Sequence, residues 1–191
     1  MREEIKKGGT AGVYDFLIMK AGGGTVRNPI FDEQKKNAEQ RDIPYVTYHF
    51  PDPRRDMREQ ARKYIDWVGT GQPMYIVDVE TPLGGTRPPN KEELRKFIDE
   101  LEGLTNKQPV IYSRMTILVR IGFINEAKQF RLWIAQHLYN PENMPSEMVQ
   151  YRYFHDFTED HAGRLPPSTQ NTAIENNVIL WQFSEKGNGP H

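Results

Sequence analysis

Short β-type runs recur along the chain about every 30 residues, the usual length of one strand–helix unit, and this spacing constrains the fold more than any other feature. The runs are 13–20, 44–50, 74–80 and 109–113. Their repetition predicts an α/β fold built on a parallel sheet. In such a sheet the central strands are buried on both faces, and the continuous apolar run at 74–77 fits that position.

Helices are predicted between these runs. The segment 90–102 has apolar residues at helical spacing, and Asn90 and Glu93 form a capping-box pattern at its start. Gly103 is expected to end this helix. Two further helices are predicted at 55–68, ending at Gly69, and at 115–128.

The remainder of the chain is expected to complete one domain. Three more strands are predicted at 131–136, 148–154 and 178–184, and the polar stretch 158–177 is expected to be a loop. No linker or internal repeat divides the sequence, and 191 residues is an ordinary length for a single core. We therefore expect residues 1–191 to form a single domain.

Composition and charge exclude several classes of function. The 25 basic and 26 acidic residues leave a formal net charge of -1, which provides no global positive field to hold nucleic acid. Apolar runs are far shorter than the roughly 18 residues of a membrane span, and the charged start of the chain has no signal-peptide core. Without cysteine there are no thiol catalysts, thiolate metal sites or disulfides. We expect no nucleic-acid partner, no membrane partner and no signal peptide in this chain.

Two acidic residues lie where a predicted strand ends, which is where parallel sheets bind ligands. Asp78 and Glu80 are two positions apart, so in a strand their carboxyl groups project from the same face. Neighbouring carboxyls in a partly dry cleft do not both ionise freely, so the pKa of one should rise. The pair then offers a proton donor beside an anion, as glycosidic cleavage requires, with Glu80 as the expected acid. A solvent-facing acidic turn and a Mg²⁺ site are the alternatives for these two residues.

Aromatic residues at the neighbouring strand ends favour a sugar-binding groove. The C–H faces of sugar rings pack on Tyr and Trp, and sugar hydroxyls take hydrogen bonds from amides. For the tryptophans the alternative is burial in the sheet core. The expected substrate-binding residues are Tyr48, Tyr112, Trp133, Trp181 and Gln182.

Other polar features have simpler interpretations. The glycines at 22–24 lack the Gly-Lys-Ser/Thr ending of a P-loop, so they are expected to form a loop along the cleft floor. His49 is expected either to be a satisfied core histidine or to hydrogen-bond in the groove. The cluster at 155–161 is expected to be a solvated loop, so no metal site is predicted. The basic residues within 54–63 are expected to form an exposed helix face.

Six motifs follow one another in chain order: Phe16-Leu-Ile-Met-Lys-Ala21 with three glycines, Tyr48-His-Phe50, Met74-Tyr-Ile-Val-Asp-Val-Glu80, Pro109-Val-Ile-Tyr-Ser113, Leu132-Trp-Ile-Ala135 and Leu180-Trp-Gln-Phe-Ser184. Each motif alone is loose. Their order over residues 13–184 resembles that of glycoside hydrolase family 25, the Chalaropsis-type lysozymes or N-acetylmuramidases of bacteria, fungi and phages.

The resemblance implies a modified, TIM-like β/α barrel that hydrolyses the β-1,4 bond between N-acetylmuramic acid and N-acetylglucosamine without a metal cofactor. It implies that Glu80 is the general acid and Asp78 the stabilising carboxylate of a reaction that retains the sugar configuration. The four aromatic residues named above match positions near the sugar groove. Bacterial peptidoglycan is the implied partner, and the implied place of action is outside the cell or at the wall, after secretion or release as a phage endolysin.

Two features of the family pattern are unmatched: the first strand, with its Asp-Val-Ser type motif, and the acidic segment after the last strand. Either the barrel is incomplete and open at a seam between 13–20 and 178–184, or another segment fills the gap. An open seam would leave unpaired backbone groups and allow self-association through the sheet edge. The unmatched acidic positions keep a second hypothesis open, that of a non-catalytic cell-wall-binding or phage structural module.

Overall fold

Alternating strands and helices form the part of the chain that the computed structural model describes, residues 16–82, 84–85, 87–135 and 178–182. In chain order the elements are β1 (Leu17–Gly23), β2 (Val26–Arg27), α2 (Phe31–Glu39), β3 (Tyr45–Phe50), α3 (Met57–Val68), β4 (Tyr75–Val79), α4 (Lys91–Thr105), β5 (Val110–Ser113), α5 (Met115–Arg120), α6 (Ile124–Ala127), β6 (Leu132–Ala135) and β7 (Val178–Gln182). The predicted α/β fold is confirmed.

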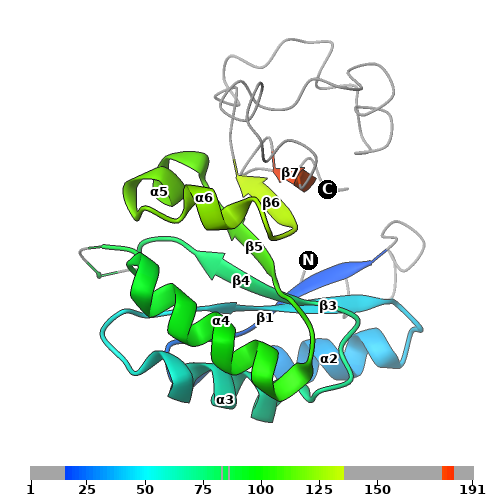
Figure 1. Cartoon of the computed structure of the whole chain (residues 1–191). Coiled ribbons are helices and arrows are strands. Elements are labelled where there is room, and N and C mark those ends of the chain that lie inside the picture. Colours follow the sequence, from blue (N-terminus) through cyan, green and yellow to red (C-terminus); the bar gives the residue numbers. More distant parts are fainter. Residues whose placement is uncertain (1–15, 83, 86, 136–177, 183–191) are drawn as a thin grey trace, which may run out of the picture.

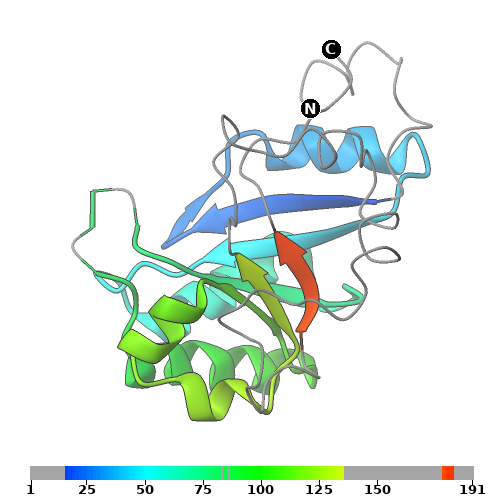
Figure 2. The same cartoon turned by 90° about the horizontal axis from the view of Figure 1, so that it is seen from above.

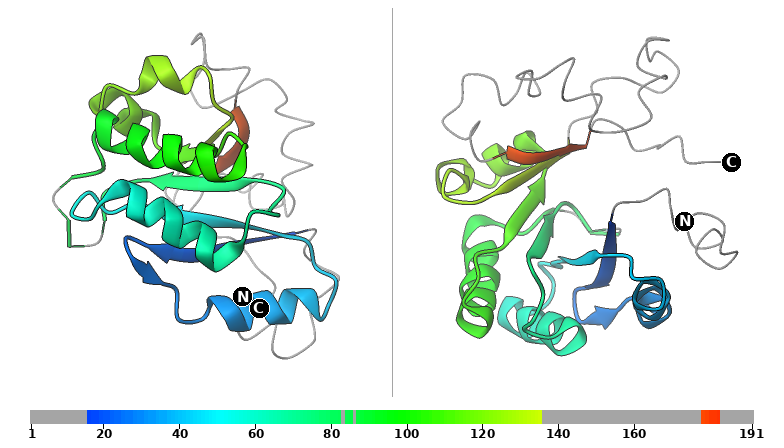
Figure 3. Two further views of the ribbon diagram at one scale, coloured as in Figure 1. Left: turned by 60° about the horizontal axis from the view of Figure 1, so that its bottom comes forward. Right: turned by 90° about the vertical axis from the view of Figure 1, so that its right-hand side faces the viewer.

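The strands form one sheet that curls into part of a barrel. Its order is β2-β1-β3-β4-β5-β6-β7, in which β2 pairs antiparallel with β1 and every other pair is parallel. Figures 1 and 3 show α2, α3 and α4 along the convex face, and Figure 2 shows the curl from above. In the described residues β2, the antiparallel partner of β1, and β7 lie at opposite ends of this order, so the seam between β1 and β7 is open there. The strand and loop predicted at 148–154 and 158–177 lie outside these residues.

Side chains alternate between the two faces of the curled sheet. In β4, Tyr75, Val77 and Val79 pack in the large core beneath the helices. Ile76 points the other way and joins a smaller apolar cluster with Val46 on the concave face. All five residues of β4 are buried, as predicted for a central strand with two covered faces.

The predicted capping box at the start of α4 is present. The Asn90 side chain accepts a hydrogen bond from the Glu93 N–H at 2.9 Å, and the Glu93 carboxylate accepts one from the Asn90 N–H at 2.8 Å. Gly103 does not end the helix, which runs on to Thr105. Asn106 ends it instead by adopting a left-handed conformation with φ 53°, a role that Asn shares with glycine.

The other two predicted helices differ in outcome. The α3 helix follows an Asp56 N-cap and ends at Gly69, close to the prediction. The prediction of a single helix over 115–128 is wrong, because this range contains two short helices, α5 and α6. Gly122 separates them with a φ of 72°, which a helix cannot accommodate.

The glycine run at the end of β1 agrees only in part with the prediction, because Gly23 and Gly24, but not Gly22, line a cavity at this edge of the sheet. Gly22 and Gly23 belong to the strand, and only Gly24, with φ 57°, turns the chain towards β2. A Cβ atom on Gly22 would overlap the ring of Trp67 on α3 and lie 2.6 Å from the carbonyl oxygen of Val26. Gly22 therefore allows the sheet to approach the helix closely and is not a cleft-floor residue.

We expect Gly22→Ala to lower the free energy of unfolding by about 1–3 kcal/mol, the usual cost of overpacking a tight site. The matched control is Gly71→Ala, because nothing lies within 4 Å of a Cβ atom at Gly71. Urea unfolding of both variants measures the difference. Equal stability of the two variants would show that the helix α3 can move away at no cost.

Candidate active site

Asp78 and Glu80 lie together on the concave side of the sheet, at the carboxyl end of β4. Asp78 is 8% exposed, and Glu80 follows the strand with a side chain that is 30% exposed. Both line one cavity of about 370 Å³. The two-residue spacing therefore places both carboxyl groups on one face, as predicted. The other lining residues are Ile18, Tyr48, Ile76, Tyr112 and Trp133.

Three of the five predicted substrate-binding residues are aromatic walls of this cavity. The rings of Tyr112 and Trp133 meet edge to face, with centroids 4.6 Å apart and an interplanar angle of 63°. Burial raises the pKa of Tyr48 to about 12, helped by the charges of Asp78 and Glu80. The Tyr112 pKa is raised by the same causes. Both hydroxyls therefore stay protonated at neutral pH and can donate hydrogen bonds to a ligand.

Trp181 and Gln182, the other two predicted binding residues, belong to β7. The backbone pairs Trp181 with Ile134 and Gln182 with Ala135 of β6. Their side chains lie outside what the structure describes, so their place in the groove stays a prediction.

Asp78 is the carboxyl group whose pKa rises. Burial and the neighbouring Glu80 charge raise the pKa of Asp78 to about 8, against a smaller opposing effect of Lys20. Its Oδ1 atom is buried and has no hydrogen-bond partner among the described residues. The sequence interpretation expected one raised pKa but gave the acid role to Glu80. The structure shows why the rise falls on Asp78: it lies within the strand, whereas Glu80 lies beyond it and reaches solvent.

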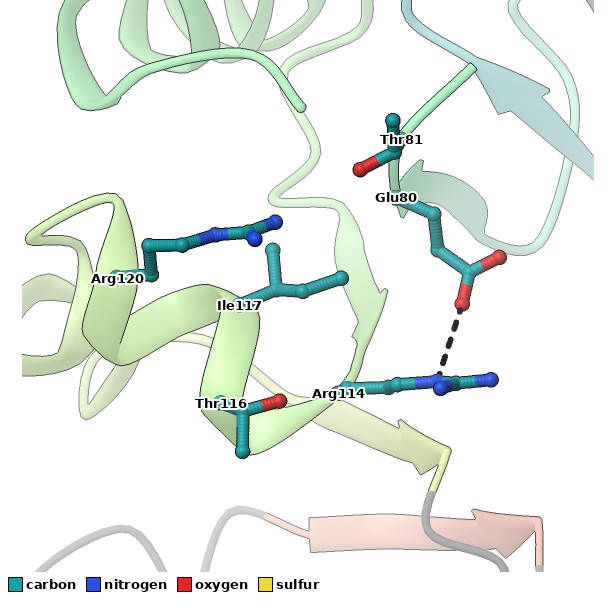
Figure 4. Close-up of a pocket in the computed structure, with 6 residues that line it drawn as sticks. All are labelled: Glu80, Thr81, Arg114, Thr116, Ile117 and Arg120. Atoms are coloured by element: carbon teal, nitrogen blue, oxygen red, sulfur yellow. Dashed lines mark ion pairs between the residues drawn. The ribbon is translucent and has the colours of Figure 1, made fainter. Parts of the chain in front are cut away.

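Glu80 lies where two cavities meet. Its Oε1 atom is 3.8 Å from Nε of Arg114, and Figure 4 shows this ion pair at the edge of a second cavity, of about 450 Å³. Thr81 also lines this second cavity and takes part in a third, of about 380 Å³, which includes Lys20 and Phe50. Glu80 is thus shared by the first and second cavities and Thr81 by the second and third, and the three cavities together are called the groove below.

His49 is not part of the groove. It points to the helix side, where its ring stacks on Phe97 with centroids 5.3 Å apart. Neither ring nitrogen has a hydrogen-bond partner in the described part of the chain. Burial lowers the pKa of His49 to about 3, so the ring is neutral. His49 is therefore a core histidine, which is one of the two predicted alternatives. The hydrogen bonds expected for such a residue are not present among the described residues.

Two cationic residues of the groove were not singled out as functional by the sequence interpretation. Lys20 lines the third cavity and lies over the Phe50 ring at 5.3 Å. Arg114 pairs with Glu80. Lys20 lies within β1, and Arg114 directly follows β5. Their positions near strand ends are the sequence signal that could have indicated a role in the groove. The basic face of α3 is exposed as predicted, and Arg58 and Arg62 both pair with Glu100 of α4.

Metal-ligand clusters and membrane-spanning helices are both absent from the described residues. No three His, Asp or Glu residues gather there as metal ligands would, and the cluster at 155–161 lies outside these residues. None of the helices described is long and apolar enough to cross a bilayer.

The motif order, the curled sheet and the paired carboxyls agree with a match to a family model. The model for glycosyl hydrolases family 25 matches residues 3–191. The chain belongs to this family. Its members are glycosidases. No curated protein matches the chain.

Several solved structures have a similar fold. The spore cortex lytic enzyme SleM of Clostridium perfringens has a TM-score of 0.66 at 23% identity, covering 93% of this chain and 56% of that one. A muramidase of Trichobolus zukalii has a TM-score of 0.58 at 20% identity, covering 72% of this chain and 75% of that one. The autolysin LytC of Streptococcus pneumoniae, solved with a synthetic peptidoglycan ligand, has a TM-score of 0.55 at 15% identity. The match covers 76% of this chain and 37% of that one. At these identities the likeness shows the shared fold.

The buried carboxyl of this glycosidase should make its stability depend on pH. Because the folded-state pKa of Asp78 is about 8, above the ordinary value, the folded chain holds a proton that the unfolded chain has lost, and stability falls as pH rises from about 4 to 8. We expect Asp78→Asn to remove this loss. The free energy of unfolding of Asp78→Asn, relative to that of wild type, should rise by about 2 kcal/mol or more between pH 5 and pH 9. Each tenfold change in proton affinity corresponds to about 1.4 kcal/mol.

Urea unfolding at the two pH values measures this gain. Asp66→Asn is the control, because Asp66 is exposed on α3. An equal pH dependence for wild type and Asp78→Asn would mean that Asp78 is ionised in the folded protein.

Proposed function

We propose that this glycosidase is a muramidase that hydrolyses the β-1,4 bond between N-acetylmuramic acid and N-acetylglucosamine in bacterial peptidoglycan. The observation that carries the proposal is the pair Asp78 and Glu80 in an aromatic-lined cavity at the carboxyl ends of parallel strands. Family membership supports glycosidic cleavage, and the shared fold of the solved muramidases supports this class of substrate. The LytC structure with its peptidoglycan ligand supports the same assignment.

In the proposed mechanism the two carboxyls share one proton. Asp78 holds it in the empty site, since burial raises its pKa to about 8. Glu80 is the more exposed and lines two of the cavities of the groove, so the glycosidic oxygen can approach it. When a sugar displaces water from the groove, the proton passes from Asp78 to Glu80. Glu80 is then the acid and Asp78 the anion.

Bond cleavage then follows in two steps. The carbonyl oxygen of the substrate's own acetamido group attacks C1, the C1–O bond breaks, and the leaving oxygen takes the proton from Glu80. The Asp78 carboxylate stabilises the positive charge that develops on the acetamido group. A water molecule then attacks C1 and returns a proton to Glu80, which restores the acetamido group and retains the sugar configuration.

The aromatic walls hold the sugar in this mechanism. Tyr112 and Trp133 meet edge to face, so their ring faces and edges form a fixed corner against which an apolar sugar face can pack. The Tyr48 hydroxyl, protonated because its pKa is about 12, can donate to a sugar oxygen. We propose that Trp181 and Gln182 extend this binding surface on the side of β6.

The remaining aspects of the proposal concern the whole chain. We propose that residues 1–191 act as one domain, outside the cell or at the wall where peptidoglycan lies. The outer edge of β1 is partly covered, because Asn28 donates its backbone N–H to the Ala21 carbonyl at 2.8 Å and its side chain to the Lys20 carbonyl at 2.9 Å. This cover limits strand addition there. Self-association through the rest of the edge stays a prediction.

We expect Glu80→Gln to lower the release of reducing sugar from purified peptidoglycan by about 100-fold or more, because a positioned general acid contributes about 10²–10⁴. Glu92→Gln is the control, since Glu92 is exposed in the first turn of α4. Equal rates for the two variants would contradict the role of Glu80. Binding of wild type to the wall without any release would favour the non-catalytic module instead.

We expect kcat/KM of the wild type to fall about tenfold per pH unit above about pH 8, because the proton shared by the pair is lost as pH rises through the pKa of Asp78. In Asp78→Asn this fall near pH 8 should be lost, since the group whose pKa causes it has been removed. The pH profiles of wild type, Asp78→Asn and Asp66→Asn measure this. A profile of Asp78→Asn that coincides with wild type would contradict proton sharing.

A further inference from the structure

A second cavity lies beside Glu80, and none of the aromatic residues of the first cavity lines it. Its volume is about 450 Å³, within the usual range of ligand pockets. Figure 4 shows the side chains of Arg114 and Arg120 extending from the α5 side towards Glu80 and Thr81, with Ile117 between them. The remaining lining residue is Thr116.

This cavity carries more positive than negative charge. Arg114 and Arg120 contribute two cations, and Glu80 is the one acidic lining residue. Arg114 is partly balanced by Glu80 at 3.8 Å. Arg120 forms no ion pair with any residue that the structure describes. A guanidinium therefore faces the cavity with its charge unbalanced, and it presents a planar fork of donors suited to a carboxylate.

We propose that this cavity is an anion subsite, in which Arg120 with Arg114 binds a carboxylate of the peptidoglycan substrate beside the scissile bond. The inference rests on the proposed function, since it places the sugar next to Glu80. Because Glu80 lines both cavities, a substituent of a ring bound beside Glu80 reaches the arginines directly. The hydroxyls of Thr81 and Thr116 add hydrogen-bonding groups, and buried Ile117 offers an apolar wall.

Two groups of peptidoglycan carry such a carboxylate at the same place on the sugar. A muramic acid without its stem peptide has a free lactyl carboxylate, and a muramic acid with its stem has the carboxylates of the peptide. Both are attached through O3 of the ring. The shared chemistry is a carboxylate on a short arm, and the experiment separates its two sources.

Binding can be measured without turnover. The probe is the disaccharide N-acetylglucosaminyl-N-acetylmuramic acid with a free lactyl carboxylate, which contains no bond of the type this enzyme would cleave. Its methyl ester is the neutral counterpart. A third probe carries the stem peptide on the lactyl group, and a fourth the same peptide with its carboxylates amidated. Titration calorimetry gives the Kd of each probe.

We expect Arg120→Gln to raise Kd for the charged probe about three- to five-fold, the range for a solvent-exposed ion pair, and to leave the neutral counterpart unchanged. Arg120→Lys should recover part of the loss, because it keeps the charge but not the fork. Arg131→Gln should match wild type, since Arg131 is exposed at the amino end of β6. A loss confined to the lactyl probe identifies the lactyl carboxylate, and a loss confined to the peptide probe identifies the stem.

Equal binding of charged and neutral probes, or no effect of Arg120→Gln on either charged probe, would overturn the subsite. Peptidoglycan turnover by wild type is measured in parallel. Absent turnover with charge-dependent binding would contradict the muramidase function and leave the subsite standing, so the two proposals fail separately.

Discussion

The pairing register of β4 against its neighbours is the constraint on which the candidate site depends. The ladder sets Asp78 opposite Tyr112, and Tyr112 opposite Trp133, so all three project from the concave face. The buried Ser113 hydroxyl donates to the Val79 carbonyl at 2.7 Å and ties β5 to β4 at the strand end. A slip of one residue would turn Asp78 into the helix-side core. Apolar packing on both faces of β4 makes that slip costly.

The same packing places an ionisable group where water is scarce. A carboxyl whose buried oxygen has no hydrogen-bond partner among the described residues costs free energy when it is charged, so Asp78 keeps a proton that an exposed aspartate would lose. The helix-side core, with fully buried side chains such as Tyr64 and Phe97, supplies stability against this cost. The proposed chemistry uses this imbalance, because a stored proton beside an anion is what glycosidic cleavage needs.

Much of this arrangement follows from local rules that can be applied to the sequence. The two-residue spacing puts Asp78 and Glu80 on one face, and the capping box begins α4 where Asn90 predicts it. Rules of this kind fail where the partner is distant in sequence. Lys20 influences Asp78 across β3, and nothing near Lys20 predicts which strand lies two places away. Similarly, the need for Gly22 comes from Trp67 on a helix far along the chain.

The charge around the groove is distributed unevenly, although the net charge of the whole chain is close to zero. The formal charge of -1 excludes a global field for polyanions. Locally, however, the acidic pair lies between two cationic flanks, Lys20 on the β1 side and Arg114 with Arg120 on the α5 side. An acidic pair alone would repel an anionic glycan from the bond that Glu80 protonates in the proposed mechanism. With cations on both sides, the carboxylates of such a glycan are attracted to the flanks, and the uncharged glycosidic oxygen is left for Glu80.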